Sequence, residues 1–159
     1  MALTVETGQQ STTANSYVTV VNYDSYLNAR YPARTDISDA QAEAYILRAM
    51  DYFEELPFVG VKASDVQSLQ WPRSNIVIDG YGKSVDEIPK EVLNAIYELA
   101  YGFEQGFGIN DPISRETVKE KIGEIEVEYK SSSADRTLLP AASQALRKLI
   151  RNPMRVVRA

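Results

Sequence analysis

The sequence predicts a mainly α fold: a helical bundle of about four helices with an inserted long loop and one β-hairpin. Three observations predict it. Apolar residues recur at helical spacings in two long segments, 38–56 and 89–107. Residues 57–88 between them carry no long period, and "EIEVEYK" near residue 128 alternates strictly, as strands do. The 159 residues suit one domain, with an N-terminal arm at 1–16, a hairpin at 115–130 and a C-terminal tail at 152–159.

The first elements follow from local signals. Residues 4–16 are small and polar, which predicts an extended arm or loop. Thr19 can cap a helix over 20–30, with four apolar or aromatic residues near one face: Tyr23, Tyr26, Leu27 and Tyr31. The tyrosines either edge the core or form an exposed aromatic patch for a partner.

The second helix is the clearest. Ser38 and Gln41 form a capping-box pair, and Pro57 stops the helix. Its expected buried face contains Ala42, Ile46, Ala49, Phe53 and Leu56. In the loop that follows, "IVI" is a short strand candidate and "DGYG" predicts a turn. Pro89 suits the first turn of the third helix, whose expected buried face contains Val92, Ile96, Leu99, Ala100, Phe103 and Phe107.

The hairpin prediction at 115–130 rests on Gly123-Glu124 as a two-residue turn. An isolated hairpin is marginal in water, so we expect this one to pack on helices or on a neighbouring subunit. A last helix is expected to begin at Pro140, carry Leu146, Leu149 and Ile150, and end before Pro153.

Composition excludes several functions. The chain has no histidine and no cysteine, so it has no Ser-His-Asp triad, cysteine nucleophile, disulfide or thiolate metal site. No phosphate-binding or calcium-binding loop motif occurs. We therefore expect no enzyme, no cofactor and no metal. A reducing, cytoplasmic origin fits this composition, and neither a secretory signal nor a membrane-spanning run of ~18 apolar residues is expected.

Charge is divided along the chain. Residues 1–135 carry all 22 acidic residues and 11 of the 17 basic ones, a net charge of −11. Residues 136–159 carry six basic residues and no acidic one. This division suggests contact with nucleic acid or lipid, self-association through opposite charges, or only a solvated helix face.

Two segments offer candidate contacts. Trp71 and Arg73 flank a proline; the tryptophan can pin the loop onto the helices, contact another subunit or stack on a base of single-stranded nucleic acid. The basic tail can contact DNA, contact a protein or fray in solvent. The candidate subunit or partner contacts are Trp71, Arg73, Ile122, Ile125, Val127, Tyr129, Arg151, Arg155, Val156, Val157 and Arg158.

An ordered set of segments carries a family resemblance. These are "MALTVETG", "ANSYVTVVNYDSYLNAR", "AYILRAMDYFEE", "LQWPRS", "EIPKEVLNAIYELA", "RETVKEKIGEIEVEYK" and "LPAASQALRKLI", which cover most of the chain. With them the chain resembles tailed-bacteriophage proteins of the "DnaT-like single-stranded-DNA-binding" family, whose small members look like head–tail connector subunits.

The resemblance implies a structural protein of the virion neck, assembled in the host cytoplasm. It would form a homo-oligomeric ring, often of twelve copies, between the portal protein and the tail terminator or next neck protein. The ring would continue the DNA channel without sequence-specific binding. The alternative is a single-stranded nucleic-acid-binding module.

Overall fold

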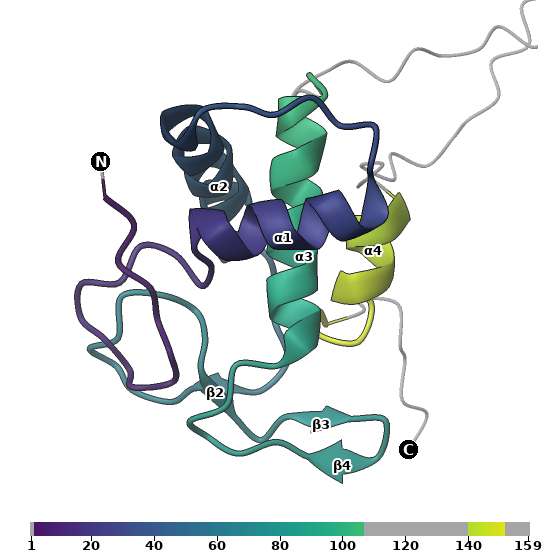
Figure 1. Cartoon of the computed structure of the whole chain (residues 1–159). Coiled ribbons are helices and arrows are strands. Elements are labelled where there is room, and N and C mark those ends of the chain that lie inside the picture. Colours follow the sequence, from purple (N-terminus) through teal and green to yellow (C-terminus); the bar gives the residue numbers. More distant parts are fainter. Residues whose placement is uncertain (1, 107–139, 152–159) are drawn as a thin grey trace, which may run out of the picture.

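A computed structural model describes residues 2–106 and 140–151. Its helices are α1 (Val20–Arg30), α2 (Asp39–Glu54), α3 (Lys90–Glu104) and α4 (Pro140–Leu146). In Figure 1, α3 runs through the middle of the molecule, α1 crosses it, and α2 and α4 lie on either side. The mainly α prediction is confirmed. Within the described residues, no helix combines the length and the apolarity needed to cross a membrane.

The structure confirms the side-chain caps from which the starts of α1 and α2 were predicted. The Thr19 hydroxyl accepts the Asn22 N–H (3.1 Å) at the start of α1. Ser38 and Gln41 form the complete capping box of α2. At α3 the prediction is wrong by one residue: Pro89 is the N-cap, with extended backbone, and Lys90 is the first helical residue.

The core surrounds α3, which is buried on most of its circumference. Neighbours on three sides explain this: α2 and α4 pack along it, and α1 crosses it. The predicted faces of α2 and α3 are buried through Phe53 and Phe103; Leu56 is half-buried, and Phe107 lies outside the described residues. Removal of these side chains from water is the main force that holds the bundle together.

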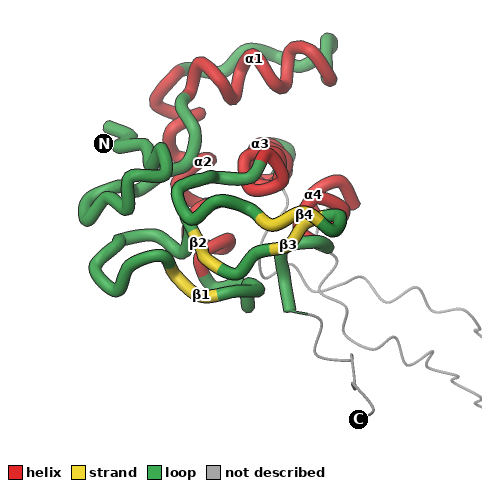
Figure 2. Tube along the Cα trace, turned by 90° about the horizontal axis from the view of Figure 1, so that it is seen from below, coloured by secondary structure: helices red, strands yellow, loops and turns green. Residues whose placement is uncertain are grey.

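Residues 57–88 form a loop region with two small antiparallel strand pairs. β1 (Val61–Lys62) pairs with β2 (Arg73–Ser74), and β3 (Val77–Ile78) pairs with β4 (Tyr81–Gly82). Figure 2 shows both pairs from below, with β3–β4 next to α4. The expected "DGYG" turn and the "IVI" strand together form the β3–β4 hairpin.

The last helix ends earlier than predicted. α4 stops at Leu146, and the chain then pairs with the segment after α2 instead of continuing as a helix to Pro153. The Val59 N–H donates to the Leu149 carbonyl (2.9 Å), and the Arg151 N–H donates to the Pro57 carbonyl (2.7 Å). These bonds satisfy the Val59 N–H and the Pro57 carbonyl. If residues 149–151 were helical, their backbone groups would be bonded within the helix instead.

The predicted N-terminal arm or loop is a loop that closes on its own chain. Val5 and Ser16 form a parallel bridge, and the Ser68 hydroxyl donates to the Ala14 carbonyl (2.7 Å). The loop encloses Glu6, only 3% exposed, whose carboxylate accepts the N–H groups of residues 8, 10 and 11 at 2.6–3.1 Å. Its polar sequence thus folds around one buried anion.

Candidate nucleic-acid interface

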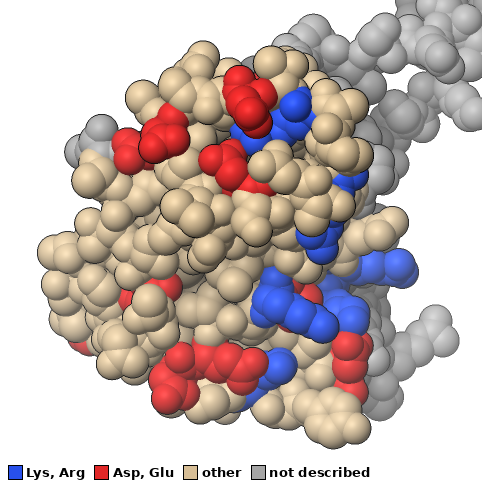
Figure 3. Space-filling model, in the orientation of Figure 1, with Lys and Arg blue, Asp and Glu red and all other residues tan. Residues whose placement is uncertain are grey.

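Basic side chains gather on one side of the molecule. In Figure 3, lysine and arginine run down the side where the end of α1 and α4 lie, while carboxylates form separate patches among the uncharged residues of the remaining face. Arg30 ends α1, and Arg147 and Lys148 directly follow α4; all three are exposed. We call this the basic side. Exposed cations are what a phosphate backbone requires of a protein surface.

A hollow of about 550 Å³ lies at the upper part of this side, near the C-terminal ends of α1 and α3. Tyr31 and Tyr101 line it, and their rings stack with centroids 4.3 Å apart and planes 23° apart. Arg30 also lines it. We call it the tyrosine hollow; its full lining is Arg30, Tyr31, Pro32, Ala33, Arg34, Thr35, Ile37, Tyr101, Glu104 and Gln105.

The chain direction after α1 creates the hollow. Tyr31 precedes Pro32, which disfavours continuation of the helix, and Tyr31 takes a non-helical conformation as the C-cap. Its hydroxyl donates to Glu98 Oε2 (3.0 Å), while the Tyr26 hydroxyl donates to Glu98 Oε1 (2.8 Å). Two hydroxyls therefore solvate a carboxylate that is only 7% exposed and fix Tyr31 against α3.

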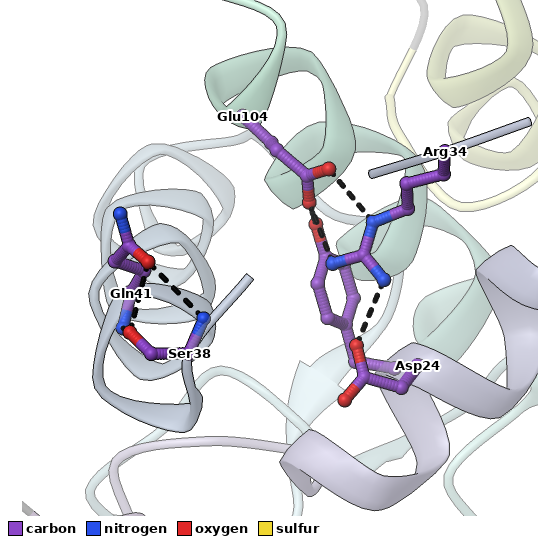
Figure 4. A network of polar contacts seen from close by, with 6 residues as sticks. Asp24, Arg34, Ser38, Gln41 and Glu104 are labelled. Atoms are coloured by element: carbon purple, nitrogen blue, oxygen red, sulfur yellow. Dashed lines mark hydrogen bonds and ion pairs between the residues drawn. The ribbon is translucent and has the colours of Figure 1, made fainter. Parts of the chain in front are cut away.

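Arg34, which lines the hollow, joins α1 and α3 through Asp24 and Glu104 (Figure 4). Its Nε and Nη2 donate to the two oxygens of Glu104 (2.7 and 2.9 Å), and its Nη1 donates to Asp24 (2.9 Å). The hydrogen bonds with Glu104 raise the pKa of Arg34, so it stays charged. Two carboxylates already compensate this charge, so Arg34 is a structural group and is not available to a phosphate.

Arg30 is the available cation at the hollow. It is exposed, and its guanidinium lies 3.6 Å from the centroid of the Tyr26 ring. Burial and the Glu98 carboxylate raise the pKa of Tyr26 and of Tyr31. Both rings therefore remain neutral near pH 7. The site offers neutral aromatic rings beside an exposed positive charge, which is the combination that stacks bases and holds a backbone phosphate.

Trp71 and Arg73 were candidate contacts with another subunit or partner, but both are buried in their own chain. Trp71 is 1% exposed, packs edge-on against Phe58 (centroids 5.8 Å apart) and donates its backbone N–H to the Tyr17 hydroxyl (2.9 Å). Arg73 donates to the carbonyls of Val59 (2.8 Å), Gly60 (3.0 Å) and residue 70 (3.2 Å). They pin the loop, the first of the alternatives, and offer no surface for another subunit or for a base.

The other sequence-predicted contacts are not brought into this site. Arg151 is exposed beyond α4. The remainder lie outside the described residues: Ile122, Ile125, Val127, Tyr129, Arg155, Val156, Val157 and Arg158. The sequence did not indicate Arg30 or Tyr101 as site residues. It did place Tyr31 on one face of the first helix, among tyrosines that could form an exposed aromatic patch for a partner, and that patch was the one signal in the sequence that pointed to this site.

Two other kinds of site are ruled out within the described ranges. The three N–H groups around Glu6 resemble an anion-binding nest, but the carboxylate of the same loop already fills it. Residues 2–106 and 140–151 contain no group of three or more acidic, histidine or cysteine side chains able to hold a metal ion. The expectation that the chain is not an enzyme stays a prediction.

Comparison with known proteins then addresses identity. Neither the curated proteins nor the solved structures gave a significant match. A family model described as "Putative DnaT-like ssDNA binding protein" matches residues 1–159. That description contradicts the predicted phage neck subunit joining portal and tail, and agrees with the single-stranded nucleic-acid alternative. Since the match spans the full length, the chain belongs to this DnaT-like family.

Proposed function

We propose that this protein binds single-stranded DNA, with the tyrosine hollow as the primary contact. The observation that carries the proposal is the full-length match to a family described by single-stranded DNA binding. The hollow supports it with stacked rings of Tyr31 and Tyr101 and with the exposed Arg30. An unpaired strand exposes base faces that such rings can stack on, whereas a duplex hides them.

Charge shapes the expected behaviour. The chain carries a net charge of −5, so most of its surface repels a phosphate backbone. We therefore expect binding to be confined to the basic side, where Arg30 and Arg147 are exposed and where the charge of Lys148 is partly compensated by Asp79 (2.6 Å). We expect the affinity to fall as salt rises, with a slope near −0.7 per phosphate neutralised on a single strand.

The test is a fluorescence-anisotropy titration of a labelled single-stranded oligonucleotide at two salt concentrations, with the same sequence as a duplex for comparison. Wild type should bind the single strand more tightly. Arg30→Glu should weaken binding about tenfold and reduce the magnitude of the salt slope by about 0.7, because one phosphate contact is lost.

Arg48→Glu is the matched control. Arg48 is also exposed and also lies over an aromatic ring, 4.8 Å from the Phe103 centroid, but it does not line the hollow. Both variants change the net charge equally, so a contact effect appears only in Arg30→Glu. Equal losses of affinity in both variants would show that binding depends on the overall charge and not on a contact with Arg30. No binding of the single strand by wild type at low salt would refute the proposed function.

A further inference from the structure

We propose that the bound strand continues from the tyrosine hollow down the basic side to the β3–β4 hairpin, where Tyr81 stacks on a second base. This inference rests on the proposed function and assigns a second contact to it. The hairpin is far from the hollow along the chain, and none of its residues line the hollow.

The exposure of Tyr81 is the first observation. Its side chain is 76% exposed, and every other aromatic side chain in residues 2–106 and 140–151 is buried or half-buried. A ring this exposed contributes little to the stability of the fold, because it buries little area. An exposed tyrosine with a free face is what base stacking requires.

The second observation is that the hairpin holds the backbone of Tyr81 in place. Asp79 and Gly80 have φ values of +53° and +87°, which gives the tight turn that matches the twist of a two-residue hairpin. Ile78, paired with Tyr81, is buried at 4% exposure and anchors the hairpin to the core. Lys148 after α4 donates to Asp79 Oδ2 (2.6 Å) and ties the turn to the basic side. The ring is therefore held by ordered backbone.

The spacing along α3 allows one strand to reach both places. Tyr101 lies near the C-terminal end of α3, and the hairpin precedes its N-terminal end (Figure 1). The 15 residues of α3 span roughly 22 Å, about six stacked nucleotides at ~3.4 Å each. α4 packs against α3, and Arg147 and Lys148 directly follow it. Stacking rings near the two ends of α3, with the exposed Arg30 at the hollow and the exposed Arg147 after α4, match a single-strand site of ordinary size.

The two contacts should differ in their salt dependence. Arg30 contributes charge, so its loss lowers the salt slope. Tyr81 contributes a neutral ring, so its loss should lower affinity and leave the slope unchanged. A merely structural role for Tyr81 would lower the urea midpoint of unfolding instead.

The experiment titrates a labelled 16-nucleotide thymidylate oligomer, about the upper end of ordinary site sizes, against wild type, Tyr81→Ala, Tyr81→Phe and Val77→Ala. Tyr81→Ala should bind about 5- to 150-fold more weakly at both salt concentrations. Tyr81→Phe keeps the ring and should bind like wild type. Val77→Ala removes another exposed side chain (62%) of the same hairpin and should have no effect.

A direct contact is checked with 5-iododeoxyuridine in the oligomer, ultraviolet cross-linking and peptide mass spectrometry. A cross-link on Tyr81 together with the affinity loss supports the inference. Undiminished binding by Tyr81→Ala, or cross-links confined to the tyrosine hollow, overturns it and leaves the proposed function standing. Failure of wild type to bind the oligomer overturns both.

Discussion

The helical part of the molecule and the loop region 57–88 are held together by different polar chemistry. Between α1 and α3, arginine and tyrosine side chains meet buried carboxylates, as Arg34 and Tyr23 meet Glu104. In the loop region, Arg73 instead donates to backbone carbonyls. The difference has a simple cause: helices satisfy their own backbone, so only side chains remain to join them, whereas irregular loops leave carbonyls that need donors.

The largest expected effect would break the helical network. Arg34→Ala leaves the Glu104 carboxylate, 6% exposed, without its cation, and should lower the free energy of unfolding by about 3–5 kcal/mol. Urea unfolding followed by circular dichroism measures this. Lys148→Ala is the control: its 2.6 Å pair with Asp79 is as short, but both side chains are about half exposed or more. Equal midpoints for the two variants would show that burial does not decide the strength of these pairs.

The next effect would break the loop network. Arg73→Lys keeps the charge but cannot reach the separate carbonyls of Val59 and Gly60 with a planar fork of donors. We expect a loss of about 2 kcal/mol in the free energy of unfolding, because carbonyls of this half-buried loop lose their donors. The same urea titration measures it, with the exposed Lys90→Arg as a control. A wild-type midpoint for Arg73→Lys would mean that charge, and not donor geometry, holds the loop.

The smallest effect is a pH dependence where the two regions meet. Glu54 of α2 accepts the Tyr17 hydroxyl (2.8 Å) and the Gln70 N–H (2.6 Å). Burial raises the pKa of Glu54 above its ordinary value near 4.5. The folded state therefore holds this proton more tightly than the unfolded state, and stability falls as pH rises through the window above pH 4.5.

Glu54→Gln should remove this pH-dependent contribution. Its amide oxygen can still accept the Gln70 N–H, but its NH₂ group can only donate to the Tyr17 hydroxyl, which already accepts the Trp71 N–H and then loses its own acceptor; this adds a cost that does not depend on pH. Urea midpoints of both proteins are measured at several pH values from about 4.5 to about 7.5, and the difference between them should change in favour of the variant as pH rises. A constant difference between the two curves would refute the raised pKa.

Local signals carried most of what was predictable. Thr19, Ser38 and Gln41 mark helix starts because a cap needs only neighbours within one turn, and Pro57 follows the end of α2 because proline cannot continue a helix. The end of α4 was missed because it depends on pairing with a segment about 90 residues earlier in the chain. The β3–β4 hairpin was predicted from its turn residues, whereas the two-residue strands β1 and β2 were too short to leave a pattern.

Most of the candidate site could not be predicted from the sequence, because its residues are also far apart along the chain. Tyr31 and Tyr101, or Arg34 and Glu104, are 70 residues apart, and no spacing in the sequence announces that they meet. Trp71 drew attention as a rare residue type, but rarity says nothing about burial, and the structure places it in the core. The exposed ring was an inconspicuous tyrosine in a turn motif.

The sealed position of Trp71 also determines what the intrinsic emission of the protein can report. It is the single indole of the chain, it is 1% exposed, and it does not line the hollow. Its emission should therefore be blue in the native protein and shift red when urea admits water to the ring. A titration with nucleic acid should leave the emission unchanged, so tryptophan fluorescence reports the folding of this chain and does not respond to the ligand.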